Sequence, residues 1–329
     1  MNRTIKIGIL LLVVVLLAGA TVWLWTHRVR YSDTDPAFNR AYWAQEIQRH
    51  GAKNAYQEFK ERTQKAPPAR QHFAAHVMGS VLAQKLGTDG IAVCDPTFSF
   101  GCFHGLFASI IAEKGTPVIS ELNAACVKAY GPLGTGCTHG IGHGIMEYVG
   151  YENIEKALEL CDLTTQQVPL LGCTSGVFME YNQPLSGDPK NLAPGTRTFD
   201  VAHPYEPCTN VAERFQSSCY FELGNWLRNT MESDTAKRDA VCAGLKGEPR
   251  SRCFMGDASA GAQAHGYDMK TSLAECSSLA SEDEFSCRAG VRWGFFQVTE
   301  TRARADEACA YADSMRRDAC VMRGDLTRG

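Results

Sequence analysis

The sequence lacks the motifs that identify several common classes of enzyme. It has no G-x-S-x-G elbow, no phosphate-binding P-loop and no dinucleotide-binding fingerprint. It also has no long run of basic residues, and the formal net charge is −3 over 329 residues. Because nucleic-acid-binding proteins carry concentrated positive charge, we expect no nucleic-acid partner.

Cysteine, in contrast, is abundant and regularly spaced, although no C-x-x-C pair occurs. The 14 cysteines fall into pairs whose members are mostly 11 residues apart, and the first members recur about every 34 residues. A repeat of that length is typical of helical hairpins stacked into a solenoid. The pairs are Cys94–Cys102, Cys126–Cys137, Cys161–Cys173, Cys208–Cys219, Cys242–Cys253, Cys276–Cys287 and Cys309–Cys320.

The spacing within the pairs predicts disulfide bonds across turns. Residues 11 apart on one helix lie about 16 Å apart, whereas the Cα atoms of a disulfide lie within about 7 Å. Turn-forming residues do separate most pairs, as at Asp95-Pro96 and Gly131-Pro132, but the gap after Cys208 has no clear helix breaker. Zinc ligands are usually paired at shorter spacings. Because so many disulfides require an oxidising compartment, we expect the repeats to lie outside the cytosol.

The N-terminus predicts a membrane anchor. Residues 7–25 form an uncharged apolar run that is long enough to span a bilayer. A signal peptide cleaved after Ala20 is the alternative, but the apolar run continues past that position. We expect a single-pass inner-membrane protein with its C-terminal domain in the periplasm. A soluble periplasmic or secreted protein is the alternative.

The chain divides into an anchor and a helical exported part. We expect a membrane anchor at 1–26, a linker at 27–35, cysteine-free helices at 36–90, and hairpin repeats at 91–323 with a proline-rich loop insertion at 183–207. The fold class is thus all-α, a solenoid of about seven disulfide-linked hairpins after a transmembrane helix. In period and cysteine pairing it resembles tetratricopeptide and Sel1-like repeats, particularly the secreted kind with one disulfide per hairpin.

Histidine is concentrated in three motifs of the N-terminal half. The pairs in His72-Phe-Ala-Ala-His76 and His139-Gly-Ile-Gly-His143 have the i, i+4 spacing that places both rings on one helical face. His104 and His139 each follow the second cysteine of their pair by two residues, so they occupy equivalent positions in adjacent repeats. We expect these rings to lie along one surface with two carboxylates. The candidate metal ligands are His72, His76, His104, His139, His143, Glu147 and Glu180.

This set of residue types favours a transition metal. Imidazole and carboxylate suit zinc, copper or iron, whereas haem is disfavoured because no C-x-x-C-H attachment motif occurs. A structural role for the histidines is the alternative. However, later repeats have Ser175, Phe221, Met255, Ala289 and Met322 at the equivalent position, so the fold does not require histidine there.

Two functional hypotheses follow. The first is a membrane-tethered metal-binding repeat protein, which could be a metalloenzyme. The second is a non-catalytic periplasmic scaffold that binds a protein or peptide partner in the groove of its solenoid. Convergence of the histidine rings within a few ångströms would favour the first hypothesis over the second.

Overall fold

The computed structural model describes residues 35–131, 134–165, 171–183, 197–231, 234–297 and 301–325. Within these ranges every regular element is a helix, and no strand occurs. The expected anchor and most of the loop insertion lie outside the described residues. No helix in the described ranges has the length and apolar character needed to cross a membrane.

The cysteine-free region forms helices α2 (Arg40–His50), α3 (Ala52–Thr63) and α4 (Pro68–Leu86), preceded by a short 3₁₀ helix at Pro36–Phe38. Asn39 caps α2 by accepting a hydrogen bond from the backbone of Tyr42. Gly51 separates α2 from α3 with a φ of 80°, a conformation that glycine adopts without steric cost. Pro67 and Pro68 stand at the break before α4, where proline suits the first turn of a helix.

Each predicted cysteine pair is a disulfide, with Cα atoms 5.4 to 5.7 Å apart. The second cysteine of each pair lies within a helix, among its first three residues in the first three pairs and at its seventh residue in the other four. These helices are α5 (Gly101–Lys114), α7 (Thr135–Val149), α9 (Cys173–Asn182), α10 (Glu213–Thr230), α12 (Gly247–Ala264), α14 (Ser281–Gln297) and α15 (Ser314–Arg323).

The first cysteine of most pairs lies in or beside a shorter helix. These elements are η2 (Gly87–Ala92), α6 (Ile119–Tyr130) after η3 (Thr116–Val118), η5 (Cys161–Leu163) after η4 (Tyr151–Asn153) and α8 (Ile154–Leu160), α11 (Thr235–Ala243), α13 (Met269–Cys276) and η6 (Arg302–Cys309). The fourth pair departs from the expected hairpin because Cys208 lies in consecutive turns at 204–210. Pro204 and Pro207 explain this, since proline lacks the N–H that a helix interior needs.

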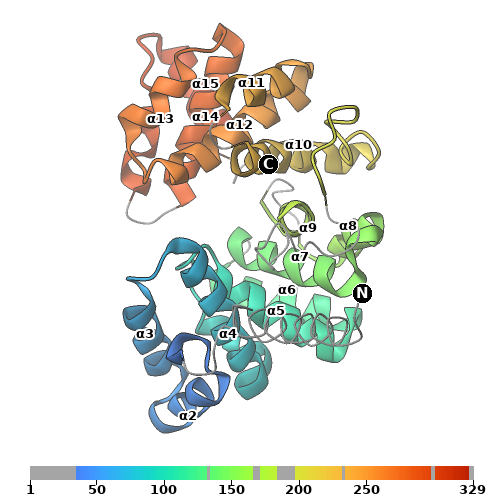
Figure 1. Ribbon diagram of the computed structural model, residues 1–329, viewed down its shortest axis with the longest axis vertical. Helices are drawn as coiled ribbons and strands as arrows, with labels where there is room; N and C mark the ends of the chain where they lie inside the picture. The colour runs from blue at the N-terminus through green and yellow to red at the C-terminus, as the bar shows by residue number, and fades with distance from the viewer. Residues whose placement is uncertain are drawn as a thin grey trace, which may run out of the picture.

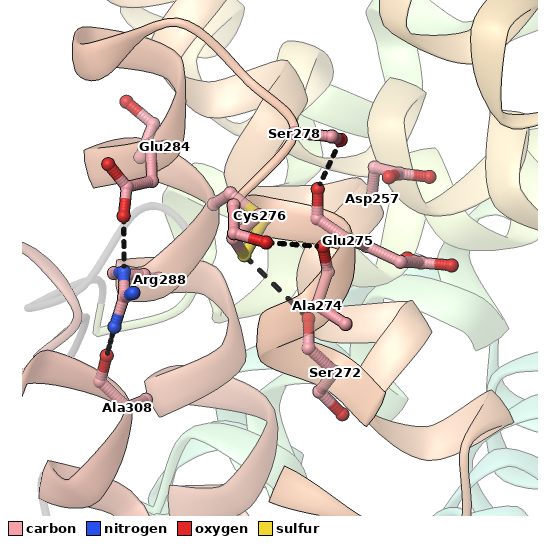
Figure 2. The surroundings of a disulfide bond; sticks show 12 residues. Asp257, Ser272, Ala274, Glu275, Cys276, Ser278, Glu284, Arg288 and Ala308 are labelled. Carbon is pink, nitrogen blue, oxygen red and sulfur yellow. Dashed lines mark hydrogen bonds and ion pairs between the residues drawn. A yellow bond between two sulfur atoms is a disulfide. The ribbon is translucent and has the colours of Figure 1, made fainter. Parts of the chain in front are cut away.

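Figure 2 shows how a disulfide joins one hairpin and a neighbouring side chain ties it to the next. Cys276, at the end of α13, is bonded to Cys287 on α14. On α14, Arg288 donates to Glu284 at 2.8 Å and to the carbonyl of Ala308, in η6, at 3.3 Å. The hairpin is therefore closed covalently and linked to the following hairpin by hydrogen bonds.

The helices that contain the second cysteines pack against one another in chain order. After α4 come α5, α7, α9, α10, α12 and α14, each in contact with its predecessor. Figure 1 shows α2 to α9 in the lower part of the molecule and α10 to α15 in the upper part. The contact between α9 and α10 joins these two parts.

Glycines let these helices approach closely. A Cβ added at Gly105 would lie 2.0 Å from the carbonyl oxygen of His76, and one at Gly176 would lie 2.0 Å from that of His139. Gly256 and Gly290 are equally crowded by the backbone of the preceding helix. These positions all lie three residues after a second cysteine. Because the backbones of neighbouring helices are in direct contact at these glycines, side chains from three successive helices can lie together.

Candidate metal centre

Five histidine rings converge between α4, α5 and α7. His72 and His76 extend from α4, His104 from α5, and His139 and His143 from α7. The ring centroid of His104 lies 3.8 Å from that of His143 and 5.2 Å from those of both His72 and His76. The rings thus form one continuous cluster centred on His104.

Within each i, i+4 pair the two Nε2 atoms face each other. They lie 3.1 Å apart in His72 and His76, and 3.0 Å apart in His139 and His143. Two nitrogens bound to one metal at 2.0–2.1 Å lie about 2.9 to 3.4 Å apart for angles from 90° to tetrahedral. Each pair therefore has the spacing of a bidentate metal ligand.

The outer nitrogens of three rings are held by hydrogen-bond acceptors. His72 Nδ1 lies 2.9 Å from the carbonyl oxygen of Phe98, and His143 Nδ1 lies 2.8 Å from Glu180. His139 Nδ1 lies 3.2 Å from the Ser175 hydroxyl, which donates to a carboxylate at 2.6 Å. A carbonyl can only accept, so His72 carries its proton on Nδ1, and its Nε2 lone pair faces the cluster. Metal-binding histidines are commonly oriented in this way.

The carbonyl that orients His72 lies in an unusual turn. Phe98, Ser99 and Phe100 have φ values between 55° and 62°, the left-handed region that residues other than glycine rarely adopt. Such conformations cost about 1 kcal/mol or more each and are concentrated at functional sites. The turn lies between the two cysteines of the first disulfide, Cys94 and Cys102, which hold its ends together.

His104 differs from the other four rings. It is 2% exposed, and neither of its nitrogens has a hydrogen-bond partner among the described residues. A buried polar group left unpaired costs about 1–3 kcal/mol. His104 also belongs to two groups of three histidines whose ligand atoms lie within 4.8 Å of one another, one with each i, i+4 pair. Its nitrogens therefore have the position of metal ligands and no other role among the described residues.

Burial favours the uncharged form of all five rings. It lowers the pKa of His72 and His143, and lowers the pKa of His76, His104 and His139 well below the usual value. For four of the rings, neighbouring histidines lower the pKa further, because two adjacent imidazolium charges would repel each other. A metal ion requires the neutral ring, so the environment favours the form that coordinates.

The two carboxylates predicted as ligands have different positions. Glu180 is fully buried and contacts the outer nitrogen of His143, while its other oxygen accepts from Tyr151 at 2.5 Å. Glu147 is exposed. Partial burial of its carboxyl and the charge of Glu180 raise the pKa of Glu147 to about 7. Neither carboxylate belongs to the three-histidine groups found among the described residues. Glu180 therefore orients the candidate ligand His143, and Glu147 lies outside both groups of ligands.

Sequence analysis missed Glu222 and Tyr151, and treated Ser175 only as a substitute for histidine. Glu222 is buried on α10 and accepts from Ser175 and Asn225. Burial raises the pKa of Glu222 to about 7, against the effect of those two hydrogen bonds. One signal was present, because Glu222 stands three residues after a second cysteine, where most repeats have glycine. Its contact with the histidine cluster, through Ser175, depends on the packing of α9 against α10.

The described histidines outside the cluster have a different environment. His50, His203 and His265 each lie within 3.5 Å of a carboxylate oxygen, on Glu46, Asp200 and Glu275 respectively. Among the described histidines, only the five clustered rings pack against one another. The described histidines therefore divide into single rings close to an acidic side chain and one dense group of rings.

Comparison of the chain with protein-family models, with characterised proteins and with solved structures gives no significant match. Function therefore has to be inferred from the residues of the site.

Proposed function

We propose that this protein binds a transition metal through its histidine cluster, in an extracytoplasmic helical-repeat domain tethered to the membrane. The observation that carries the proposal is the contact between His139 and His143. Their Nε2 atoms lie 3.0 Å apart while both Nδ1 atoms lie within hydrogen-bond distance of acceptors.

The protonation of this pair explains why a cation is needed. When Glu180 and Glu222 are ionised, His143 donates its Nδ1 proton to Glu180, and His139 donates its own to Ser175. Neither neutral ring then has a proton on Nε2, so two lone pairs face each other inside the protein. A metal ion between them converts this repulsion into two coordinate bonds.

The donor set indicates which metals fit. The inward-facing atoms are imidazole nitrogens, and all cysteines are bonded to one another, so no thiolate is available. Zinc, copper and iron suit such a set, whereas magnesium and calcium prefer oxygen. The rings of His104 and His143 stack at 3.8 Å, which leaves no space for a haem between them.

The architecture and location belong to the same proposal. The chain-order packing of α4, α5, α7, α9, α10, α12 and α14 supports a solenoid. The seven disulfides indicate an oxidising compartment. The apolar run at residues 7–25 would anchor the domain to the inner membrane, with the repeats in the periplasm. The metal would thus be bound outside the cytosol.

Metal content of the full-length protein, isolated with its disulfides intact, tests the proposal. Elemental mass spectrometry is expected to find at least one equivalent of zinc, copper or iron per chain. A variant with His72, His76, His139 and His143 all changed to Gln should retain less than a tenth of that metal. A His50→Gln/His203→Gln control changes histidines outside the cluster and should retain all of it.

Absence of metal from the wild-type protein would contradict the proposal. Wild-type protein that takes up no zinc, copper or iron, even after reconstitution with each ion, would remove the metal-binding proposal. The alternative of a scaffold for a protein or peptide partner would then be the better account of the chain.

A further inference from the structure

The ring of His104 is shared by the two halves of the cluster. It extends from α5, which packs against both α4 and α7. His104 forms one three-histidine group with His72 and His76, and another with His139 and His143. Among the described residues, no group of ligand atoms within 4.8 Å of one another contains both pairs. The cluster is therefore divided into two triads that meet at one ring.

We propose that the centre holds two metal ions bridged by the imidazole ring of His104. One ion is bound by His72, His76 and one nitrogen of His104. The other is bound by His139, His143 and the second nitrogen of His104. This inference rests on the proposed metal-binding function and specifies the number and connection of the ions.

A single ion would leave much of the site unused. The two nitrogens of an imidazole point in different directions, so one ion binds only one of them. The other nitrogen of His104 would remain buried without a partner, at a cost of about 1–3 kcal/mol. The i, i+4 pair that binds no ion would also keep its two Nε2 atoms about 3 Å apart with no metal between them. Two ions satisfy both nitrogens of His104 and both pairs.

The bridge has a defined proton balance. A neutral imidazole carries one N–H proton and one lone pair. The first ion binds the lone pair of His104, and the second ion displaces the remaining proton, which leaves to solvent. The bridging ring then carries one negative charge, shared by two cations. No oxidant or reductant takes part in this step.

The two ions would have unequal surroundings. Beside the pair on α7 lie Glu180, against His143, and Ser175 with Glu222, against His139. Beside the pair on α4, the outer nitrogen of His72 faces the neutral carbonyl oxygen of Phe98. Because a carboxylate makes its histidine partner a stronger donor, the α7 ion should bind more tightly. Each ion has three nitrogen ligands, which leaves a further position for water or a small molecule.

Copper titration of the metal-stripped full-length protein tests the bridge. We expect Cu²⁺ binding to saturate at two equivalents per chain. At saturation, the two unpaired spins couple through the shared ring, so the integrated electron paramagnetic resonance signal should fall well below two spins. At one equivalent, the uncoupled signal of the α7 site should appear at nearly full intensity.

Two variants remove one triad each. His72→Gln/His76→Gln and His139→Gln/His143→Gln should each bind one equivalent with a full, uncoupled signal. His50→Gln/His203→Gln should keep two coupled ions. Circular dichroism establishes which variants fold, and the wild-type titration decides the question even if neither triad variant does.

The outcomes separate this inference from the proposed function. Saturation at one equivalent, or two ions with full uncoupled intensity, would overturn the bridge but leave a metal-binding protein. Absence of binding in the wild-type protein would overturn both. Two coupled ions that persist in either triad variant would also contradict the assignment of ligands.

Discussion

Glu180 on α9 and His143 on α7 form a buried hydrogen bond of 2.8 Å between a carboxylate oxygen and Nδ1. Their side chains are 0% and 3% exposed, so water contributes little to orienting either group. The carboxylate holds the imidazole with its other nitrogen directed at His139. A residue from one repeat thus positions a candidate metal ligand of the preceding repeat.

Removal of this carboxylate should weaken metal binding without abolishing it. For Glu180→Gln we expect a 10- to 100-fold loss of affinity, the usual effect of changing a group that orients a metal ligand. Competition with a chelator of known affinity measures the change. Glu147→Gln is the matched control, since Glu147 is exposed and lies outside both three-histidine groups. Equal affinities for Glu180→Gln and wild type would show that the carboxylate has no such role.

Glu222 should give stability a distinct pH dependence. Its folded-state pKa is raised from 4.5 to about 7, so between these values the folded chain holds a proton that the unfolded chain releases. The free energy of unfolding must then fall as pH rises through this interval, by up to about 1.4 kcal/mol per pH unit. Urea denaturation of metal-free wild type and Glu222→Gln should show this slope in their difference. A difference that is constant from pH 4.5 to 7 would contradict the assignment.

Gly105 should be intolerant of even a methyl group. Because an added Cβ would lie 2.0 Å from the carbonyl of His76, Gly105→Ala must move α5 away from α4. We expect destabilisation by about 1–3 kcal/mol or more, together with reduced metal uptake as His104 moves from its partners. Glu113→Ala, at an exposed position of the same helix, should change stability by less than about 0.5 kcal/mol. If Gly105→Ala has wild-type stability and metal content, the close packing is not required.

The sequence predicted the local features that follow from fixed spacings. Cysteines 11 residues apart require a turn between them if they are to bond, and turn-forming residues lie between most of the pairs. The i, i+4 spacing of His139 and His143 placed both rings on one face before any fold was known. These features depend on a few neighbouring residues, so a single sequence contains the information.

The rest of the site depends on contacts between distant segments. The hydrogen bonds of Ser175 with His139 and with Glu222 join residues 36 and 47 positions apart. The carbonyl of Phe98 is presented by a left-handed turn of residues other than glycine, and no sequence pattern indicated it. Glu180 was expected among the ligands, but it contacts the outer nitrogen of His143 instead. Which of these positions a carboxylate takes depends on how closely the neighbouring helices pack. A hairpin was expected around the fourth cysteine pair, but Cys208 lies in consecutive turns beside Pro204 and Pro207.

Two disulfides should differ in their effect on the site although they have the same spacing. Cys276→Ala/Cys287→Ala and Cys126→Ala/Cys137→Ala each open a link between residues 11 positions apart. Each should lower the free energy of unfolding by about 3 kcal/mol, because the unfolded chain loses a constraint of similar length.

Only Cys126→Ala/Cys137→Ala should reduce metal affinity, because Cys137 lies two residues before His139 and fixes the start of α7. Thermal denaturation and chelator competition measure the two effects separately. Equal metal affinity in both variants would show that this disulfide does not position the histidines.

Anomalous diffraction from crystals of the reconstituted protein tests the central claim most directly. Data collected above and below the absorption edge of the added metal locate that metal alone. We predict a strong anomalous peak within about 2.0–2.1 Å of Nε2 of His139 and His143, with a second peak beside His72 and His76 if His104 is a bridge. A metal-loaded crystal with no peak among the five histidines would contradict the account.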